Sequence, residues 1–160
     1  MADKDTSPHI SQITEYLYIS VWPRGEHVEE IAALGVCLML SMHLICPTKM
    51  LGNPPVKLWY LPAIDKSFFP LPIRILNKGV QAALPVINGG GPALVHCRAG
   101  VHCSVAQAAC VLIGVGYNAD NAMQLIKEKR TVADPDVGYI QERILLFEAQ
   151  QPDLKQPRRK

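Results

Sequence analysis

The sequence lacks any stretch of about 18 consecutive apolar residues, the length that a helix needs to cross a membrane. It also opens on a polar run, M-A-D-K-D-T-S-P, which has none of the apolar core that a signal peptide carries. These absences argue against a secreted or membrane-bound protein. We therefore expect a cytoplasmic protein that does not bind membranes.

An excess of charge of one sign is also missing. Sixteen lysines and arginines face fourteen acidic residues, for a net charge of +2, and the one dense basic run is at residues 155–160. Such a balance does not predict binding to nucleic acid, and we interpret the run as a solvated tail. The length of the chain suits one well-buried core, so the sequence predicts a flexible segment (1–12), one domain (13–150) and a basic tail (151–160). We expect a monomer.

Five cysteines, an odd number in mostly apolar surroundings, fit a disulfide framework poorly. They favour a reducing compartment. Two His-Cys pairs, His96-Cys97 and His102-Cys103, raise the alternative of a zinc site, but their spacing does not resemble known finger or ribbon patterns. We expect neither a metal nor a cofactor.

The most informative stretch runs from residue 93 to residue 104, A-L-V-H-C-R-A-G-V-H-C-S. Its three apolar residues follow a Gly-Gly-Gly-Pro breaker, as expected of a buried central strand. Small and apolar residues resume at Val105, which predicts a buried helix directly after a tight loop that turns at Gly100.

A loop of this kind points backbone N–H groups inward and ends at the positive end of a helix. That arrangement binds tetrahedral oxyanions, and the same field stabilises a thiolate. Cys97 lies at the start of this loop, so we expect it to be a nucleophile, although an inert buried thiol is the alternative.

The run V-H-C-R-A-G-V-H-C-S resembles the signature loop of the cysteine-dependent protein phosphatases, in particular the dual-specificity branch. That signature is His-Cys, five residues, Arg, then Ser or Thr. His96, Cys97, Gly100 and Ser104 match it. The position of the arginine holds Cys103 instead.

The resemblance implies roles for these residues. Cys97 would attack phosphorus, Ser104 would help its thiolate leave again, and His96 would support the loop. The phosphoryl oxygens would be bound by the residues in between: Arg98, Ala99, Gly100, Val101, His102 and Cys103. We interpret His102 as solvent-facing, and Asp134 and Asp136 as turn residues beside Pro135.

A general acid is also required, because the leaving oxygen needs a proton. Asp65 lies 32 residues before Cys97, after a predicted strand, about where the resembling family carries its acid. The alternative is an ordinary turn aspartate. Trp22, Arg24 and the Phe68-Phe69 pair are candidates for the rim of the cleft.

The missing arginine leaves two hypotheses open. An arginine binds phosphate as a two-pronged donor that a thiol cannot replace, and losing such a contact costs on the order of 2–5 kcal/mol. That loss corresponds to roughly tens to thousands of fold in rate. The chain is then either a weak phosphatase acting on phosphoproteins or small phosphoesters through a phosphocysteine, or an inactive pseudophosphatase that binds phosphate or a partner.

Strand and helix patterns alternate along the chain. Strands are predicted at 15–20, 36–41, 57–61 and 93–95, and helices at 26–34, at 73–87 (kinked or shortened by Pro85), after the signature loop, after Asn118 and after Asp136. Residues 43–55 suggest an irregular excursion. The order predicts a single α/β domain with a mainly parallel central sheet flanked by helices, which resembles the dual-specificity phosphatase fold.

Overall fold

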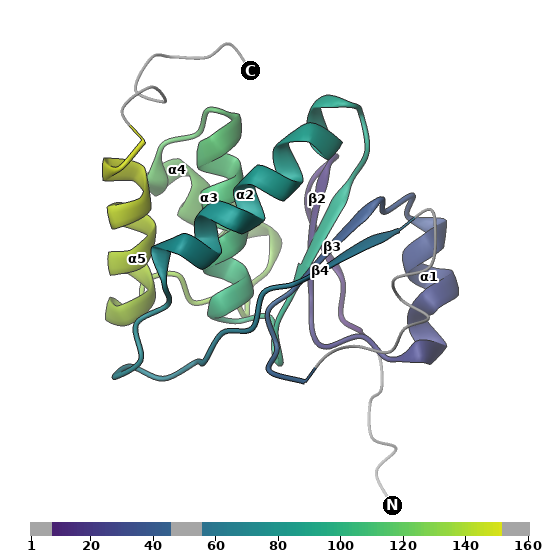
Figure 1. Cartoon of the computed structure of the whole chain (residues 1–160), viewed down its shortest axis with the longest axis horizontal. Coiled ribbons are helices and arrows are strands. Elements are labelled where there is room, and N and C mark those ends of the chain that lie inside the picture. Colours follow the sequence, from purple (N-terminus) through teal and green to yellow (C-terminus); the bar gives the residue numbers. More distant parts are fainter. Residues whose placement is uncertain (1–7, 46–55, 152–160) are drawn as a thin grey trace, which may run out of the picture.

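The computed structural model describes residues 8–45 and 56–151, which form a five-stranded sheet with helices on both faces (Figure 1). The strands are β1 (Ser11–Thr14), β2 (Leu17–Ser20), β3 (Leu38–Ser41), β4 (Lys57–Tyr60) and β5 (Ala93–His96). The helices are α1 (Val28–Ala33), which follows the 3-10 turn η1 (Gly25–His27), α2 (Ile73–Asn88), α3 (Cys103–Val115), α4 (Ala119–Lys129) and α5 (Gly138–Ala149).

The strand order is β1-β2-β5-β3-β4, and every pair is parallel except β1 with β2. This confirms the predicted α/β fold with a mainly parallel sheet. β5 is the central strand and all four of its residues are buried, as its apolar sequence predicts. Its last residue, His96, lies opposite Ser20 of β2 and Ser41 of β3. The loop after β5 therefore begins at the carboxyl edge of the sheet, where α/β proteins place their ligands.

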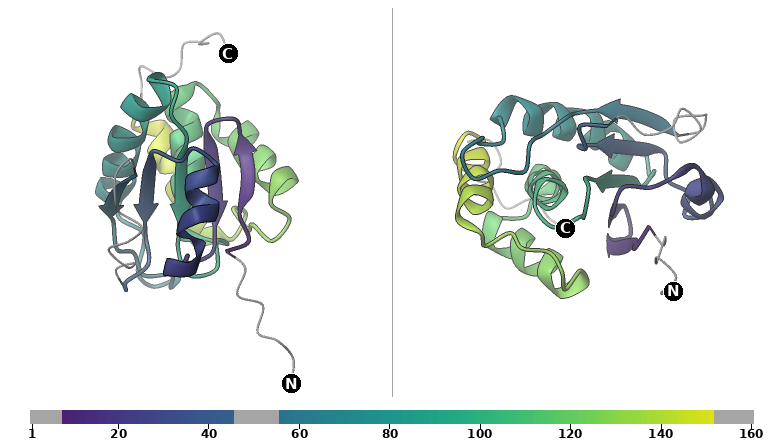
Figure 2. Two further views of the ribbon diagram at one scale, coloured as in Figure 1. Left: turned by 90° about the vertical axis from the view of Figure 1, so that its right-hand side faces the viewer. Right: turned by 90° about the horizontal axis from the view of Figure 1, so that it is seen from below.

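The two faces of the sheet are covered unequally. α1 covers one face over a small apolar cluster, whereas α2, α3, α4 and α5 lie on the other (Figures 1 and 2). α3 is enclosed by the sheet and its neighbouring helices, and nearly all of its residues are buried. The first turn of α3, beside the signature loop, is thus fixed by the core.

Two elements differ from the sequence expectation. The predicted first strand begins at Leu17, because Glu15 and Tyr16 form the turn of a hairpin whose other strand, β1, was not predicted. β1 starts at Ser11, inside the range expected for the N-terminal segment. α2 is not shortened by Pro85 but continues through it to Asn88.

Most of the predicted N-terminal segment and C-terminal tail (residues 1–7 and 152–160), and most of the excursion expected at 43–55, lie outside the described residues. Within residues 8–45 and 56–151, no helix combines the length and the apolar character needed to span a bilayer.

Candidate active site

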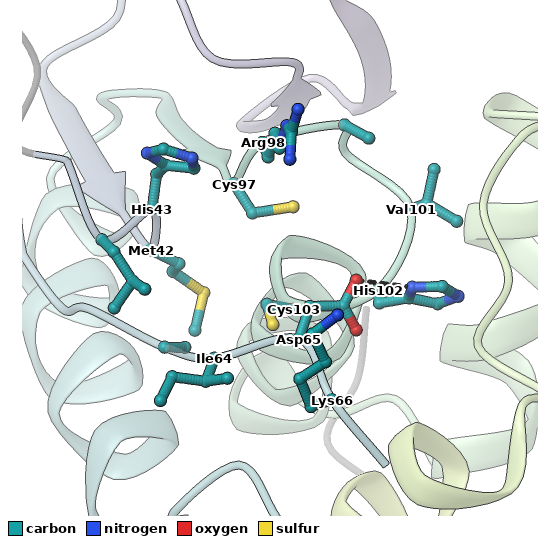
Figure 3. A pocket seen from close by; sticks show the side chains of 13 residues that line it. Met42, His43, Ile64, Asp65, Lys66, Cys97, Arg98, Val101, His102 and Cys103 are labelled. Atoms are coloured by element: carbon teal, nitrogen blue, oxygen red, sulfur yellow. Dashed lines mark hydrogen bonds and ion pairs between the residues drawn. The ribbon is translucent and has the colours of Figure 1, made fainter. Parts of the chain in front are cut away.

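A cavity of about 470 Å³ opens at the carboxyl edge of the sheet, where β3, β4 and β5 end. The loops after these three strands provide its walls (Figure 3). Its lining residues are Met42, His43, Leu44, Ala63, Ile64, Asp65, Lys66, Cys97, Arg98, Ala99, Val101, His102 and Cys103. The candidate nucleophile and the candidate acid, far apart in the sequence, therefore share one cavity.

Cys97 begins the loop and is 8% exposed. The backbone N–H of Gly100 donates to its Sγ over 3.3 Å, and the Oγ of Ser104 lies 3.1 Å from the same sulfur. Both the Gly100 N–H and the Ser104 hydroxyl can donate a hydrogen bond to this sulfur. The structure thus brings together three residues that the sequence singled out.

Cys103 is the first residue of α3 and is only 2% exposed. Burial, with smaller effects from Cys97 and Asp65, raises the pKa of its thiol to about 12. Cys103 is therefore an uncharged thiol near neutral pH, so this wall of the cavity presents no cation at that position.

Asp65 follows β4 on the opposite side of the cavity. Its Oδ2 lies 2.8 Å from Nδ1 of His102, and its Oδ1 accepts a hydrogen bond of 2.5 Å from the hydroxyl of Tyr139. The interpretation of His102 as solvent-facing was wrong, because the imidazole is 23% exposed and lies between Asp65 and Asp134, whose Oδ2 is 3.8 Å from Nε2. Asp134 is thus more than a turn residue.

Arg130 is a residue of the site that the sequence analysis missed. Its side chain is nearly buried, at 4% exposure, and lies behind the signature loop. Nε donates to the carbonyl oxygen of Gly100 over 2.8 Å, and Nη2 donates to that of Ala99 over 3.3 Å. Burial lowers the pKa of Arg130, whereas the charge of Cys97 opposes that shift. The guanidinium supports the loop by binding the carbonyl oxygens of Ala99 and Gly100.

The same guanidinium also reaches the beginning of the chain. Nη1 donates to the carbonyl oxygen of His9 over 2.6 Å and to Oγ of Ser11 over 2.9 Å. The only sign of this role in the sequence is a basic run, K-E-K-R, which is typical of a solvated helix end. Nothing in that pattern distinguishes the buried arginine from its exposed neighbours.

His96 is fully buried at the end of β5. Burial lowers the pKa of its imidazole to about 4, so the ring is neutral near pH 7. Nδ1 lies 3.4 Å from the carbonyl oxygen of Cys97, and Nε2 has no hydrogen-bond partner among the described residues.

The residues expected at the rim are less involved. Neither Trp22 nor Arg24 lines the cavity, and the indole of Trp22 stacks on His43 at a centroid distance of 5.1 Å. Arg98, expected among the phosphate-binding residues, is exposed and lines the cavity. Phe68 and Phe69 are exposed outside the cavity. In the described ranges, no group of three or more His, Cys, Asp or Glu residues is arranged to hold a metal ion.

Comparison with known proteins places this site in context. No family model matches the chain. It is 23% identical over 140 residues to human dual specificity protein phosphatase 1, and 26% identical over 145 residues to the tyrosine-protein phosphatase yvh1 of Schizosaccharomyces pombe. These matches cover 87% and 90% of this chain but 37% and 43% of the relatives. The chain thus spans about two fifths of the length of the curated relatives it matches.

Among solved structures, that of human DUSP28 aligns with a TM-score of 0.79 at 23% identity. The alignment covers 90% of this chain and 95% of that chain. The two proteins share a fold over nearly their whole described length.

Proposed function

We propose that this chain, which resembles the dual-specificity phosphatases in sequence and fold, hydrolyses phosphomonoesters through a phosphocysteine intermediate, at a rate lowered by the absence of the loop arginine. One observation carries the proposal. The sulfur of Cys97 has Gly100 N–H and Ser104 Oγ within hydrogen-bond distance and shares its cavity with the carboxyl group of Asp65.

The reaction has two steps. The Cys97 thiolate attacks phosphorus while the departing ester oxygen takes a proton from Asp65, and the loop N–H groups bind the phosphoryl oxygens. A water then attacks the phosphocysteine and gives its proton to Asp65. The sulfur leaves as a thiolate, which the Ser104 hydroxyl stabilises by donating a hydrogen bond.

Cys103 limits this chemistry. Its buried, uncharged thiol occupies the position where the resembling signature has an arginine. The first residue of α3 therefore provides no guanidinium to bind the equatorial oxygens of the phosphoryl group. Arg130 does not substitute for it, because its donors are directed to loop carbonyl oxygens and to the N-terminal strand. The described cations that line the cavity are Arg98 and Lys66, together with the titratable His43 and His102.

The same feature supports a second candidate function. A loop that keeps its anion-binding amides but lacks the arginine still has donors for a phosphate. A pseudophosphatase that binds a phosphorylated partner without turning it over is therefore the alternative.

The substrate class we propose is a phosphorylated protein or a small phosphoester. The free thiols of Cys37, Cys97, Cys103 and Cys110 suit a reducing compartment such as the cytoplasm. We propose a monomer that binds neither nucleic acid nor membranes.

Four proteins test the proposal on 4-nitrophenyl phosphate: the wild-type chain, Cys97→Ser, Cys103→Arg and Cys103→Met. We expect Cys103→Arg to raise kcat/KM at least about tenfold, because the guanidinium adds a two-pronged contact. Methionine in Cys103→Met fills a space similar to that of arginine but carries no charge, so this variant should show no gain in kcat/KM. Cys97→Ser should remove the activity.

Two results would decide against the enzyme. If folded wild-type and Cys103→Arg proteins both fail to hydrolyse the ester, the catalytic proposal fails. Binding of inorganic phosphate by calorimetry would then support the pseudophosphatase. Activity that survives in Cys97→Ser would mean that another group is the nucleophile.

A further inference from the structure

Both oxygens of the Asp65 carboxyl group are bound by side chains that the proposed mechanism does not use. Nδ1 of His102 lies 2.8 Å from Oδ2, and the Tyr139 hydroxyl donates to Oδ1 over 2.5 Å. The hydroxyl of Tyr139 is also 3.4 Å from Nδ1 of His102, and the two rings lie 5.7 Å apart. The three side chains thus form a closed set of contacts beside the cavity (Figure 3 shows two of them).

These three residues come from three separate elements. Asp65 lies in the loop after β4, His102 precedes the first turn of α3, and Tyr139 lies in the first turn of α5. A fourth residue, Asp134, approaches Nε2 of His102 at 3.8 Å. Its backbone N–H donates to the carbonyl oxygen of Val101 over 3.1 Å, which ties the turn before α5 to the signature loop.

The hydrogen-bonding roles of two of these groups follow from their chemistry. Burial, and next the hydrogen bond to Asp65, raise the pKa of Tyr139, so its hydroxyl remains a donor. The imidazole of His102 can donate to Asp65 in the tautomer that carries its proton on Nδ1.

A carboxyl group has about four lone-pair sites, so these two contacts leave positions free on the side that faces the cavity. We propose that His102 and Tyr139 are positioning residues that fix Asp65 for proton transfer to the leaving group, an inference that rests on the proposed phosphatase activity. With the carboxyl group held from two sides, its proton passes to the ester oxygen in the first step. It is replaced from water in the second.

Orientation is the reason that the contacts matter. Pairs of partly exposed groups such as Asp65 (48% exposed) and His102 (23% exposed) add little to the stability of a fold. A proton donor, in contrast, has to lie within hydrogen-bond reach of the oxygen that it protonates, and correct placement contributes strongly to rate. Loss of either contact should therefore affect catalysis more than folding.

The test uses the Cys103→Arg protein as the background and compares His102→Ala, His102→Asn and Tyr139→Phe. Each protein is assayed on phenyl phosphate, a poor leaving group, and on 4-nitrophenyl phosphate, a good one. We expect His102→Ala and Tyr139→Phe to lower kcat on phenyl phosphate about tenfold or more, and to lower it less than about threefold on the nitrophenyl ester. His102→Asn keeps a donor at the place of Nδ1 and should recover most of the phenyl phosphate rate.

Two variants serve as matched controls. Tyr117→Phe removes a phenol beyond the far end of α3, and Asp136→Asn removes a carboxylate that is paired with Lys127 instead of His102. Neither should change the ratio of the two rates.

Equal slowing of both esters, or no change in either, would overturn the inference, as would a His102→Asn rate no better than that of His102→Ala. These outcomes leave hydrolysis by the Cys103→Arg background intact. If that background hydrolyses neither ester, the proposed function itself fails and the positioning role falls with it.

Discussion

Arg130 and Gly100 fit against each other so closely that the loop has no room for a side chain at residue 100. Nε of Arg130 donates to the carbonyl oxygen of Gly100 over 2.8 Å, and a Cβ at Gly100 would lie 2.6 Å from Nη2. It would also lie 2.8 Å from the carbonyl oxygen of Ser20. Gly100 also has a φ of +68°, in the left-handed region that residues with a Cβ rarely adopt. A side chain here would thus meet both backbone strain and close neighbours.

Gly100→Ala should therefore lower the free energy of unfolding by more than the backbone strain alone, which is roughly 1–2 kcal/mol. Gly35→Ala is the matched control, because Gly35 has a φ of +76° and a Cβ added there would meet nothing within 4 Å. Urea unfolding of both variants measures the difference. Equal losses would mean that Arg130 and the loop move apart without cost.

Asp65→Asn removes the proposed acid but keeps the size of the side chain. On phenyl phosphate, whose leaving oxygen needs a proton, we expect a loss of kcat on the order of 10²–10⁴-fold. On 4-nitrophenyl phosphate, which leaves readily as an anion, the loss should be much smaller. The Cys103→Arg background provides the rates to compare, and a loss of the same size on both esters would make Asp65 a structural residue.

The sequence predicted β5, the signature loop and α3 better than the distant side chains that hold the loop and Asp65 in place. Each of these elements has a local signal. The apolar run after the Gly-Pro breaker predicts β5, and the small residues that resume at Val105 predict α3 after the loop. The contact of Arg130 with Gly100 spans 30 positions, and that of Tyr139 with Asp65 spans 74. The sequence around Arg130 or Tyr139 therefore does not indicate which distant residue each will contact.

β1 escaped prediction for a different reason. Its four residues, S-Q-I-T, include one buried side chain, because the strand forms an edge of the sheet. Such short, mostly polar edge strands lack the apolar alternation that identifies longer ones. The contact of His102 with Asp65 was likewise not predicted, because the sequence around a polar loop residue does not show which distant side chain it will contact.

Cys97 and Cys103 line the same cavity, and we expect mild hydrogen peroxide to join them. Peroxide oxidises the Cys97 sulfur to a sulfenic acid and is itself reduced to water. The Cys103 thiol then displaces a second water to form the S–S bond. Because burial raises the pKa of Cys103 to about 12, this second step should be slow.

Peptide mapping by mass spectrometry identifies the product of this oxidation, with calorimetry of phosphate binding alongside it. A disulfide requires Cα atoms about 4.4–6.8 Å apart. We expect that holding residues 97 and 103, the two ends of the loop, at this distance distorts the loop and abolishes phosphate binding. Cys103→Ser is the control in which Cys97 should proceed to sulfinic acid. The same product in the wild-type chain, with Cys103 still reduced, would contradict the prediction.

His96 should make the protein less stable in acid. Its pKa is lowered by burial from 6.5 to about 4, so the unfolded chain takes up a proton below about pH 6.5 while the folded protein does not. Stability attributable to this residue is complete above that pH and falls as the pH drops toward 4, by roughly 3 kcal/mol in total.

Urea unfolding at several pH values between 7.5 and 4.5 measures this dependence. His96→Gln removes the titrating group, so its unfolding free energy should decline less over the same interval. Parallel curves for the two proteins would show that His96 is protonated equally in the folded and unfolded states.

The contacts of Arg130 with His9, Ser11 and the signature loop also bear on the order in which the chain can fold during synthesis. β5 and the Cys97 thiol emerge from the ribosome well before Arg130 does. Until then, the carbonyl oxygens of the loop lack their donor, and the first strand lacks one of its attachments. We therefore expect the anion-binding loop to take its final form only after Arg130 has been synthesised, when the end of α4 packs against β1 and the residues before it.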